Sequence, residues 1–309
     1  MPSIKILKPG LLTSVQDAGR YGYEHLGVMV GGWMDDFAAR WANRLVGNPL
    51  GTAVLEITLM GPTFEAQDAG WLALAGADLG ATVNDVPWQP GSTRRLDPGD
   101  CVSFGRKTSG MRGYLSFAGG LEIPAVLASQ STDLVAGFGG FQGRALAIGD
   151  ELFYVGSEVE PALAPVSTCI LDSVLHVLPG VRHGWFKSGT WEKFLAGKFR
   201  VDHRSNRVGL RLTGTPIVSE PIDGDQVSEA IAIGSVEVTP SGELLVLTKS
   251  RGSIGGYPTL AHVVVADWPI LAQLVVGQVV SFVETDESGA ACLLRQRERE
   301  LQADLVRPG

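Results

Sequence analysis

The pattern of apolar and polar residues predicts many short strands separated by turns. Apolar runs or strict alternation over about four to eight residues, bounded by glycine, proline or aspartate, are typical of strands. Such segments lie at residues 4–7, 54–59, 71–75, 101–104, 114–118, 174–178 and 245–247. In the segment 54–59, Glu56 points away from the apolar face. It faces either solvent, which is the default expectation for a lone strand carboxylate, or a cleft. A mostly β protein is predicted.

Helical spacing is rarer along the chain. The clearest helix is expected to start at Asp35 or Asp36, either of which can cap it, and to stop at Gly47. Two further helical patterns cover residues around 191–195 and 286–304. The second of these is rich in arginine and acidic residues, which indicates a solvated face.

The segment Leu244–Pro269 joins two apolar, strand-like runs, residues 245–247 and 263–265, through a glycine-rich bend. The paired glycines of Gly255–Tyr257 allow unusual backbone angles and a close approach of a ligand, and the tyrosine adds a flat face with a hydroxyl. Two interpretations remain open. The bend is either a hairpin loop between two core strands, which is the more common case, or part of a binding site.

The length of 309 residues favours two domains over one. Residues 156–168 are rich in proline, alanine and serine, so we expect them to link an N-terminal lobe, residues 1–160, to a C-terminal lobe, residues 170–309. Short motifs recur in the same order in both halves, for example at residues 55–62 and 210–216. We therefore expect two related β-rich lobes with a ligand cleft between them.

Composition narrows the classes of partner. The formal net charge is −8 and no stripe of Lys and Arg occurs, which argues against nucleic-acid or membrane binding. The three cysteines lie far apart, which suggests neither a disulfide framework nor a metal site and fits a reducing cytoplasm. The first ten residues lack a signal sequence, and polar residues interrupt the most hydrophobic window, residues 260–280, so we expect neither secretion nor a membrane span.

Familiar catalytic motifs are absent from the sequence. The glycine-rich loop 137–144 lacks the register and the following helix of a dinucleotide fingerprint, and no P-loop Gly-Lys-Ser/Thr occurs. Any ATP chemistry is therefore expected on another subunit. The five histidines show no ligand spacing and there is no Gly-x-Ser-x-Gly elbow, so neither a metal site nor a nucleophilic triad is predicted.

Polar residues on glycine-rich loops remain as candidates for chemistry. Arginine can grip a carboxylate or a carbonyl group, and hydroxyls can stabilise an oxyanion. Taken singly, each such residue more often stabilises its loop. In the loop 13–22, closure of Arg20 on Asp17 and binding of a small polar substrate both remain open.

Short motifs spread over nearly the whole chain resemble the biotin-dependent carboxyltransferase family. They are Thr13–Arg20, Ala42–Asn48, Leu55–Thr58, Ser131–Leu134, Leu178–Gly180, Ser205–Gly209 and Gly255–Pro258. This family comprises the allophanate hydrolase subunit 2 domain, the C-subunit of 5-oxoprolinase, the KipA-type antagonist and the carboxyltransferase part of urea carboxylase. The resemblance implies a mainly β fold with a few helices, a cyclophilin-like β-barrel in two related lobes.

The resemblance also implies a hydrolase subunit that is active only with partners. These would be an allophanate hydrolase subunit 1 or KipI-like protein, in a hetero-oligomer, and a large ATP-dependent hydrolase subunit. The substrate would be a small cyclic amide, as for 5-oxoprolinase, or a urea-derived molecule, as for allophanate hydrolase. No cofactor is expected on this chain itself: ATP would bind a partner, and biotin would serve only in a urea carboxylase-like reaction. The alternative is a non-catalytic module that antagonises a KipI-like kinase inhibitor.

The polar residues on glycine-rich loops, most of them within or near these motifs, give the expected site. The expected catalytic residues are Asp17, Arg20 and Arg207. The expected substrate-binding residues are Gln16, Arg112, Tyr114, Thr132, Asp133, Ser205, Asn206, Arg251, Gly255, Gly256 and Tyr257.

The sequence departs from the family pattern just before the glycine bend. Ser250, Gly252 and Ile254 stand where an acid, an amide and a hydroxyl are usual, and Glu237 and Thr239 replace a usual glutamine and proline. Because glycine cannot restore lost carboxylate and amide groups, we expect the substrate or the activity to differ from that of better-known members.

Overall fold

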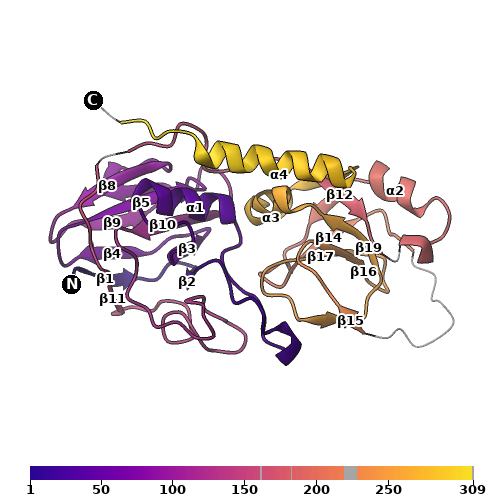
Figure 1. Ribbon diagram of the computed structural model, residues 1–309, viewed down its shortest axis with the longest axis horizontal. Helices are drawn as coiled ribbons and strands as arrows, with labels where there is room; N and C mark the ends of the chain where they lie inside the picture. The colour runs from indigo at the N-terminus through magenta and orange to yellow at the C-terminus, as the bar shows by residue number, and fades with distance from the viewer. Residues whose placement is uncertain (161, 182, 219–227, 308–309) are drawn as a thin grey trace. The chain divides into compact units, whose positions relative to one another are not determined.

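The computed structural model describes residues 1–160, 162–181, 183–218 and 228–307 (Figure 1). The chain forms two compact units. Unit 1 contains residues 1–20, 31–170 and 299–309, and unit 2 contains residues 21–30 and 171–298. Each half of the sequence therefore contributes one short segment to the unit formed mainly by the other half. Pro161, in the predicted linker, lies outside the described residues.

Unit 1 is built from two antiparallel sheets. One sheet has the order β2-β3-β10-β5-β8 and the other the order β11-β1-β4-β9-β6-β7. The strands are β1 (Ser3–Lys8), β2 (Leu12–Gln16), β3 (Val54–Thr58), β4 (Thr63–Ala66), β5 (Gly70–Gly76), β6 (Ala81–Val83), β7 (Val86–Pro87), β8 (Ser92–Leu96), β9 (Cys101–Phe104), β10 (Arg112–Phe117) and β11 (Glu151–Phe153). Apolar side chains from both sheets meet in one core, for example Ile6 of β1 and Leu55 of β3.

The second face of the five-stranded sheet is covered by α1 (Asp36–Leu45), which packs on β3, β5 and β10. The helix starts as expected: Asp35 is the N-cap, and its carboxylate accepts a hydrogen bond from Ala38 N at 2.9 Å. Phe37 and Trp41 are buried in a cluster that also contains Tyr114 of β10. This face is thus removed from solvent although it carries polar side chains.

Unit 2 contains a closed barrel with the strand order β12-β19-β16-β17-β14-β13-β20. These strands are β12 (Val174–Pro179), β13 (Phe199–Val201), β14 (Gly209–Gly214), β16 (Ser235–Val238), β17 (Leu244–Leu247), β19 (Thr259–Val263) and β20 (Val279–Glu284). A separate ribbon pairs β15 (Glu229–Ala230) with β18 (Ile254–Gly255). The prediction of a mainly β protein with a barrel is confirmed.

Helices are short in unit 2 apart from the last one. They are η1 (Glu24–Leu26), η2 (His183–Trp185), α2 (Thr190–Ala196), η3 (Val265–Asp267), α3 (Trp268–Gln273) and α4 (Glu287–Gln302). Phe194 of α2 packs on Phe282 of β20, with ring centroids 4.5 Å apart, which joins this helix to the barrel. No helix in the described part of the chain combines the length and the apolar character that a membrane span needs.

The segment Leu244–Pro269 differs from its predicted structure. Strands β17 and β19 do not pair with each other, because β16 lies between them and pairs with both. The hairpin interpretation is therefore wrong: the glycine bend crosses over one strand. The apolar run 263–265 is also not a strand, since β19 ends at Val263 and a 3₁₀ turn follows. Pro269 at the first turn of α3 starts a helix here, because proline fits that position.

Candidate functional site

Asp17 lies at the end of β2 and holds the loop 129–131 in place. Its Oδ1 accepts hydrogen bonds from Gly19 N at 2.9 Å and from the hydroxyls of Ser129, at 2.7 Å, and Ser131. Its Oδ2 accepts a bond from Gln130 N at 2.6 Å. The carboxylate is buried, and all four of these donors belong to the chain itself. Of the two alternatives for this loop, the structure shows internal hydrogen bonding.

Arg20 does not close on Asp17, as the first alternative supposed, but donates to backbone carbonyls. Its Nε bonds to Val126 O at 3.1 Å and its Nη2 to Ser131 O at 2.7 Å. The guanidinium lies 4.7 Å from the ring centroid of Phe138. Burial lowers the pKa of Arg20, although the nearby charges of Asp17 and Asp133 oppose this shift.

Three other predicted residues belong to the same loops. Gln16 Nε2 donates to Thr132 O at 3.1 Å, and the Thr132 hydroxyl donates to Val15 O at 3.0 Å. Asp133 accepts hydrogen bonds from the backbone of Val135 and Ala136 and so forms a turn. The structure therefore brings Gln16, Asp17, Arg20, Thr132 and Asp133 together in one buried network.

A second polar group of unit 1 lies under α1 and is centred on Glu56. Its Oε2 accepts hydrogen bonds from Met34 N at 2.7 Å and from the Tyr114 hydroxyl at 2.9 Å. Arg112 Nε lies 3.8 Å from Oε1. Glu56 does point away from the apolar core, but the expectation that it meets solvent is wrong: it is 1% exposed, because α1 covers this face.

Tyr114 connects Glu56 to the start of α1. Besides donating to Glu56, its hydroxyl accepts a bond from Asp35 N at 2.8 Å. Burial, and then the charges of Glu56 and Asp35, raise the pKa of Tyr114 well above its usual value. The phenol therefore stays protonated and remains a donor to Glu56.

The predicted residues 205–207 lie in the loop between β13 and β14 of unit 2. The Ser205 hydroxyl accepts a bond from Arg211 N at 3.0 Å, and Asn206 Oδ1 accepts one from Val208 N at 2.8 Å. The carbonyl of Arg207 accepts a bond from Ser250 N at 2.9 Å. This last contact ties the loop to the segment that precedes the glycine bend.

Arg251 is buried beside that bend and holds two parts of unit 2 together. Its Nη2 forms an ion pair with Glu24 Oε1 at 2.7 Å, and its Nε donates to Ile231 O at 3.0 Å. Glu24 lies in η1 and Ile231 follows β15. In the bend itself Gly256 is exposed and Tyr257 is 41% exposed, which leaves the tyrosine ring able to contact a ligand.

Glu237 of β16 lies directly behind the bend and has an unusual environment. It is 3% exposed, and its Oε1 has no hydrogen-bond partner among the described residues. A Cβ at Gly255 would stand 2.8 Å from this oxygen, which shows that the carboxyl group lies directly against the bend. Burial, reinforced by the charge of Glu229, raises the pKa of Glu237 to about 7. Glu237 can therefore hold or release a proton near neutral pH.

His262 of β19 belongs to the same outer face of the barrel, since it pairs with Ser235 two residues before Glu237. Its Nδ1 lies 3.3 Å from Ser235 Oγ. Burial lowers the pKa of His262, against the opposing charge of Glu229. The imidazole is thus neutral at pH 7.

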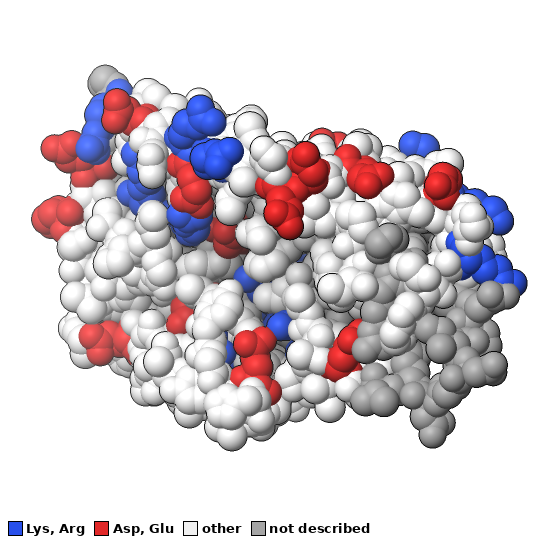
Figure 2. All heavy atoms as spheres, turned by 45° about the vertical axis from the view of Figure 1, so that its right-hand side comes forward, with Lys and Arg blue, Asp and Glu red and all other residues white. Residues whose placement is uncertain are grey.

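The described residues include no group of three His, Cys, Asp or Glu side chains placed to hold a metal ion. On the face shown in Figure 2, acidic and basic side chains are interspersed and form no continuous basic stripe.

Comparison with known proteins places the chain in a family. The family model "Carboxyltransferase domain, subdomain A and B" matches residues 26–284. The chain belongs to the biotin-dependent carboxyltransferase family. This carboxyltransferase-family chain is 36% identical over 282 residues to the C-subunit of 5-oxoprolinase from Escherichia coli, an alignment that covers 91% of each chain. It is 32% identical over 308 residues to the C-subunit of 5-oxoprolinase from Haemophilus influenzae, covering 98% of this chain and 97% of that one.

Among solved structures, the urea carboxylase of Kluyveromyces lactis is similar to the chain with a TM-score of 0.91 and 32% sequence identity. The match covers 97% of this carboxyltransferase-family chain but 29% of the urea carboxylase chain. The chain therefore corresponds in length to the subunits named above and to less than a third of the urea enzyme.

Sequence reasoning misses part of this arrangement. The alternation in β3 assigns Glu56 to solvent and no motif marks Ser129 as a candidate, although both are buried in the polar groups of unit 1. Glu237 stands out in the sequence only as a departure from the family pattern. That departure marks Glu237 as a candidate, because a carboxyl group can bind and release a proton whereas the usual amide cannot.

Proposed function

We propose that the chain is a subunit of a 5-oxoprolinase-type complex in the cytoplasm, which opens a small cyclic amide together with an allophanate hydrolase subunit 1 or KipI-like partner. The supporting observation is the 36% identity to the C-subunit of 5-oxoprolinase over 91% of both chains. A large ATP-dependent hydrolase subunit would complete the complex and bind ATP. The urea-derived substrates have weaker support, because the chain covers 29% of urea carboxylase.

In this function unit 2 supplies a proton-holding carboxyl group beside a glycine bend. Opening of a cyclic amide requires a proton at the departing nitrogen, and a group with a pKa of about 7, such as Glu237, can supply and recover one at neutral pH. Tyr257, which is 41% exposed, offers a hydroxyl and a flat ring to the substrate. Arg251 fixes the segment before the bend through Glu24 and Ile231.

The name of the family raises the question of biotin. Arg251, the arginine nearest the bend in sequence, already donates to Glu24 and Ile231. Biotin would serve only in a urea carboxylase-like reaction, so no step is assigned to biotin on this chain.

Reconstitution tests the proposal. The chain is co-expressed with its subunit 1-like partner and the large subunit, and ATP-dependent conversion of 5-oxoproline to glutamate is measured, with hydantoin, urea and allophanate as alternative substrates. We expect turnover of 5-oxoproline that requires all three proteins. The matched control omits only this chain.

The alternative function predicts a different result. A module that antagonises a KipI-like kinase inhibitor would form a tight binary complex with the partner and support no turnover of any of these substrates. That combination of results would refute the enzyme function and favour the antagonist.

A further inference from the structure

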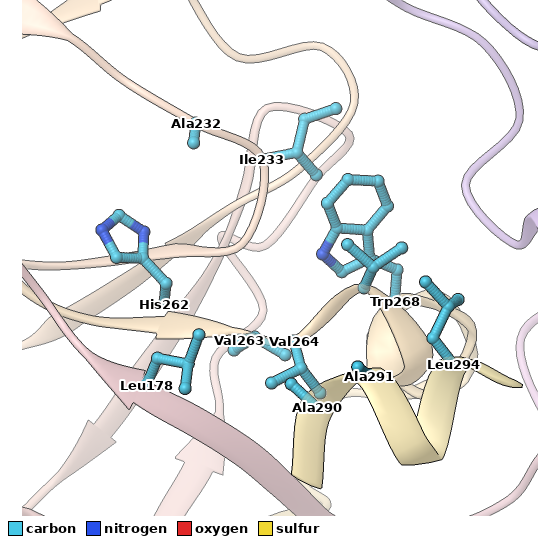
Figure 3. Close-up of a pocket in the computed structure, with 11 residues that line it drawn as sticks. Leu178, Ala232, Ile233, His262, Val263, Val264, Trp268, Ala290, Ala291 and Leu294 are labelled. Atoms are coloured by element: carbon cyan, nitrogen blue, oxygen red, sulfur yellow. The ribbon is translucent and has the colours of Figure 1, made fainter. Parts of the chain in front are cut away.

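Unit 2 contains a cavity of about 460 Å³ on the outside of the barrel (Figure 3). Its walls come from β12, β19, α3 and α4, and they include Leu178, Val264, Ala291 and Leu294. Small-molecule sites have volumes of about 300–1,000 Å³ and mainly apolar walls with a few polar groups. The cavity meets this description, and the proposed substrate site does not use it.

Two side chains bring polar atoms to these apolar walls. His262 has its Nδ1 beside Ser235 Oγ, and burial lowers its pKa, so its ring is an uncharged hydrogen-bonding group. Trp268 lines the cavity, and its buried Nε1 has no hydrogen-bond partner among the described residues. Figure 3 shows the indole nitrogen on the side of the ring that faces toward His262. An N–H donor without a partner favours a ligand that brings an acceptor.

The lining also excludes some ligands. It contains no Lys, Arg, Asp or Glu. The ammonium group of Lys249 lies 4.7 Å from the centroid of the Trp268 ring, but Lys249 is not among the residues that line the cavity. Transfer of a carboxylate or a phosphate into such walls would cost its hydration without a compensating charge. Neither 5-oxoproline, which is a carboxylate, nor ATP suits this cavity.

We propose that the cavity is a binding site for an uncharged, mainly apolar small molecule with one carbonyl group, which accepts a hydrogen bond from Trp268 Nε1. The carbonyl lies between the indole and His262, and the apolar body packs against Leu178, Val264 and Leu294.

A ligand in this site would contact a segment that leads to the glycine bend. Ala232 and Ile233 line the cavity and follow β15, which pairs with Gly255 of β18. Between them and β15, the carbonyl of Ile231 accepts the bond from Arg251. Occupancy of the cavity therefore restrains the β15–β18 ribbon.

Benzamide is the test probe, because it combines an apolar ring with an uncharged carbonyl. Isothermal titration of the full chain with benzamide, benzoate and benzene is expected to give saturable binding of benzamide, with benzoate at least about tenfold weaker. Hydrogen exchange at residues 229–233 and 254–256 is expected to slow on saturation with benzamide. Equal affinity for benzoate, or no saturable binding of benzamide, overturns the proposal.

Variants locate the binding. Ala291→Phe fills the cavity and is expected to abolish benzamide binding, whereas Cys292→Phe places the same ring at the neighbouring exposed position and leaves it unchanged. Trp268→Phe keeps an aromatic ring without the N–H and is expected to weaken binding about fivefold. Thermal unfolding shows which variants are folded. If Ala291→Phe folds and still binds benzamide as the wild type does, the ligand lies elsewhere and the proposed site is refuted. If Ala291→Phe does not fold, unchanged binding by Trp268→Phe refutes the site in the same way. These results do not depend on 5-oxoproline turnover.

Discussion

Within the described residues, each unit buries one glutamate on a strand with two neighbours, Glu56 in unit 1 and Glu237 in unit 2, and the two glutamates have opposite environments. Glu56 of β3 accepts hydrogen bonds from Met34 N and the Tyr114 hydroxyl and has Arg112 nearby. Glu237 of β16 lies against Gly255, with one oxygen that has no hydrogen-bond partner among the described residues and with a second acid, Glu229, close enough to raise its pKa.

The difference separates a structural role from a chemical one. A buried carboxylate that several donors satisfy stabilises the fold through those hydrogen bonds. Where a buried carboxyl group has an oxygen without a donor, its charged form is unfavourable and its pKa rises. Such a group can bind and release a proton near neutral pH. The polar groups of unit 1 are of the first kind, and Glu237 is of the second.

The largest effect is expected from Asp17→Ala, which removes the acceptor of four hydrogen bonds in unit 1. The loss leaves buried hydroxyls and amides without that acceptor, so the free energy of unfolding should fall by about 3 kcal/mol. Thermal unfolding measures this loss. Asp97→Ala is the control, because Asp97 forms an exposed ion pair with Arg95 and should change stability by less than about 0.5 kcal/mol. An equally stable Asp17→Ala that lacks turnover would instead make Asp17 purely catalytic.

Tyr114→Phe removes a hydroxyl from the polar group that surrounds Glu56. The variant loses two buried hydrogen bonds, one of them to a carboxylate, and should lose about 2–3 kcal/mol of unfolding free energy. Denaturant unfolding of this variant is compared with Tyr257→Phe, which removes an exposed hydroxyl and should leave stability unchanged. Similar losses in both variants would contradict the distinction between the units.

Glu237→Gln tests whether the buried carboxyl group of Glu237 makes the stability of the protein depend on pH. The folded-state pKa of about 7 lies above the ordinary value of 4.5, so the folded state binds this proton more tightly than the unfolded chain. The stability that protonated Glu237 adds to the folded state is fully present below about pH 4.5, and it is lost as the pH rises through about 7. The wild type should therefore lose roughly 2–3 kcal/mol relative to Glu237→Gln between pH 5 and pH 8. Urea unfolding at several pH values measures the difference, and parallel profiles would disprove it.

Glu24→Gln should give the smallest effect. Glu24 is partly exposed, so its ion pair with Arg251 should contribute no more than about 1 kcal/mol to stability. The expected signature is a loss that shrinks as salt is added, because screening weakens an exposed pair. Unfolding in low and high NaCl tests this, with Arg95→Gln in the exposed pair of unit 1 as the matched control. A loss above about 2 kcal/mol that ignores salt would show that the pair is structurally buried.

Local patterns predict much of the secondary structure. The N-cap and stop signals of α1 and the alternation in β3 depend on neighbours in sequence, and the structure places both elements close to the expected residues. The burial of Glu56 depends instead on a helix that packs on its face of the sheet, which no pattern within β3 reveals. The position of β16 between β17 and β19 is likewise a property of the barrel and not of the segment Leu244–Pro269.

The sequence alone does not show which of the predicted site residues act on a ligand, because their roles depend on neighbours that are distant in sequence. The sequence identifies polar residues on glycine-rich loops, but their types do not say whether the donors they meet come from the chain or from a ligand. Asp17 and Glu237 are both buried acids, and only the surrounding donors distinguish them.

Because the bend between β17 and β19 crosses over β16, its amino-acid sequence is less constrained than that of a tight hairpin. A tight hairpin would fix the length and composition of its loop, since the turn sets the register of the strands it joins. The segment 248–258 sets no register, because β17 and β19 are each aligned by β16. Substitutions at the exposed Gly252 itself are therefore expected to leave the barrel undisturbed. The same freedom makes Gly252 a suitable position for attaching a fluorescent reporter.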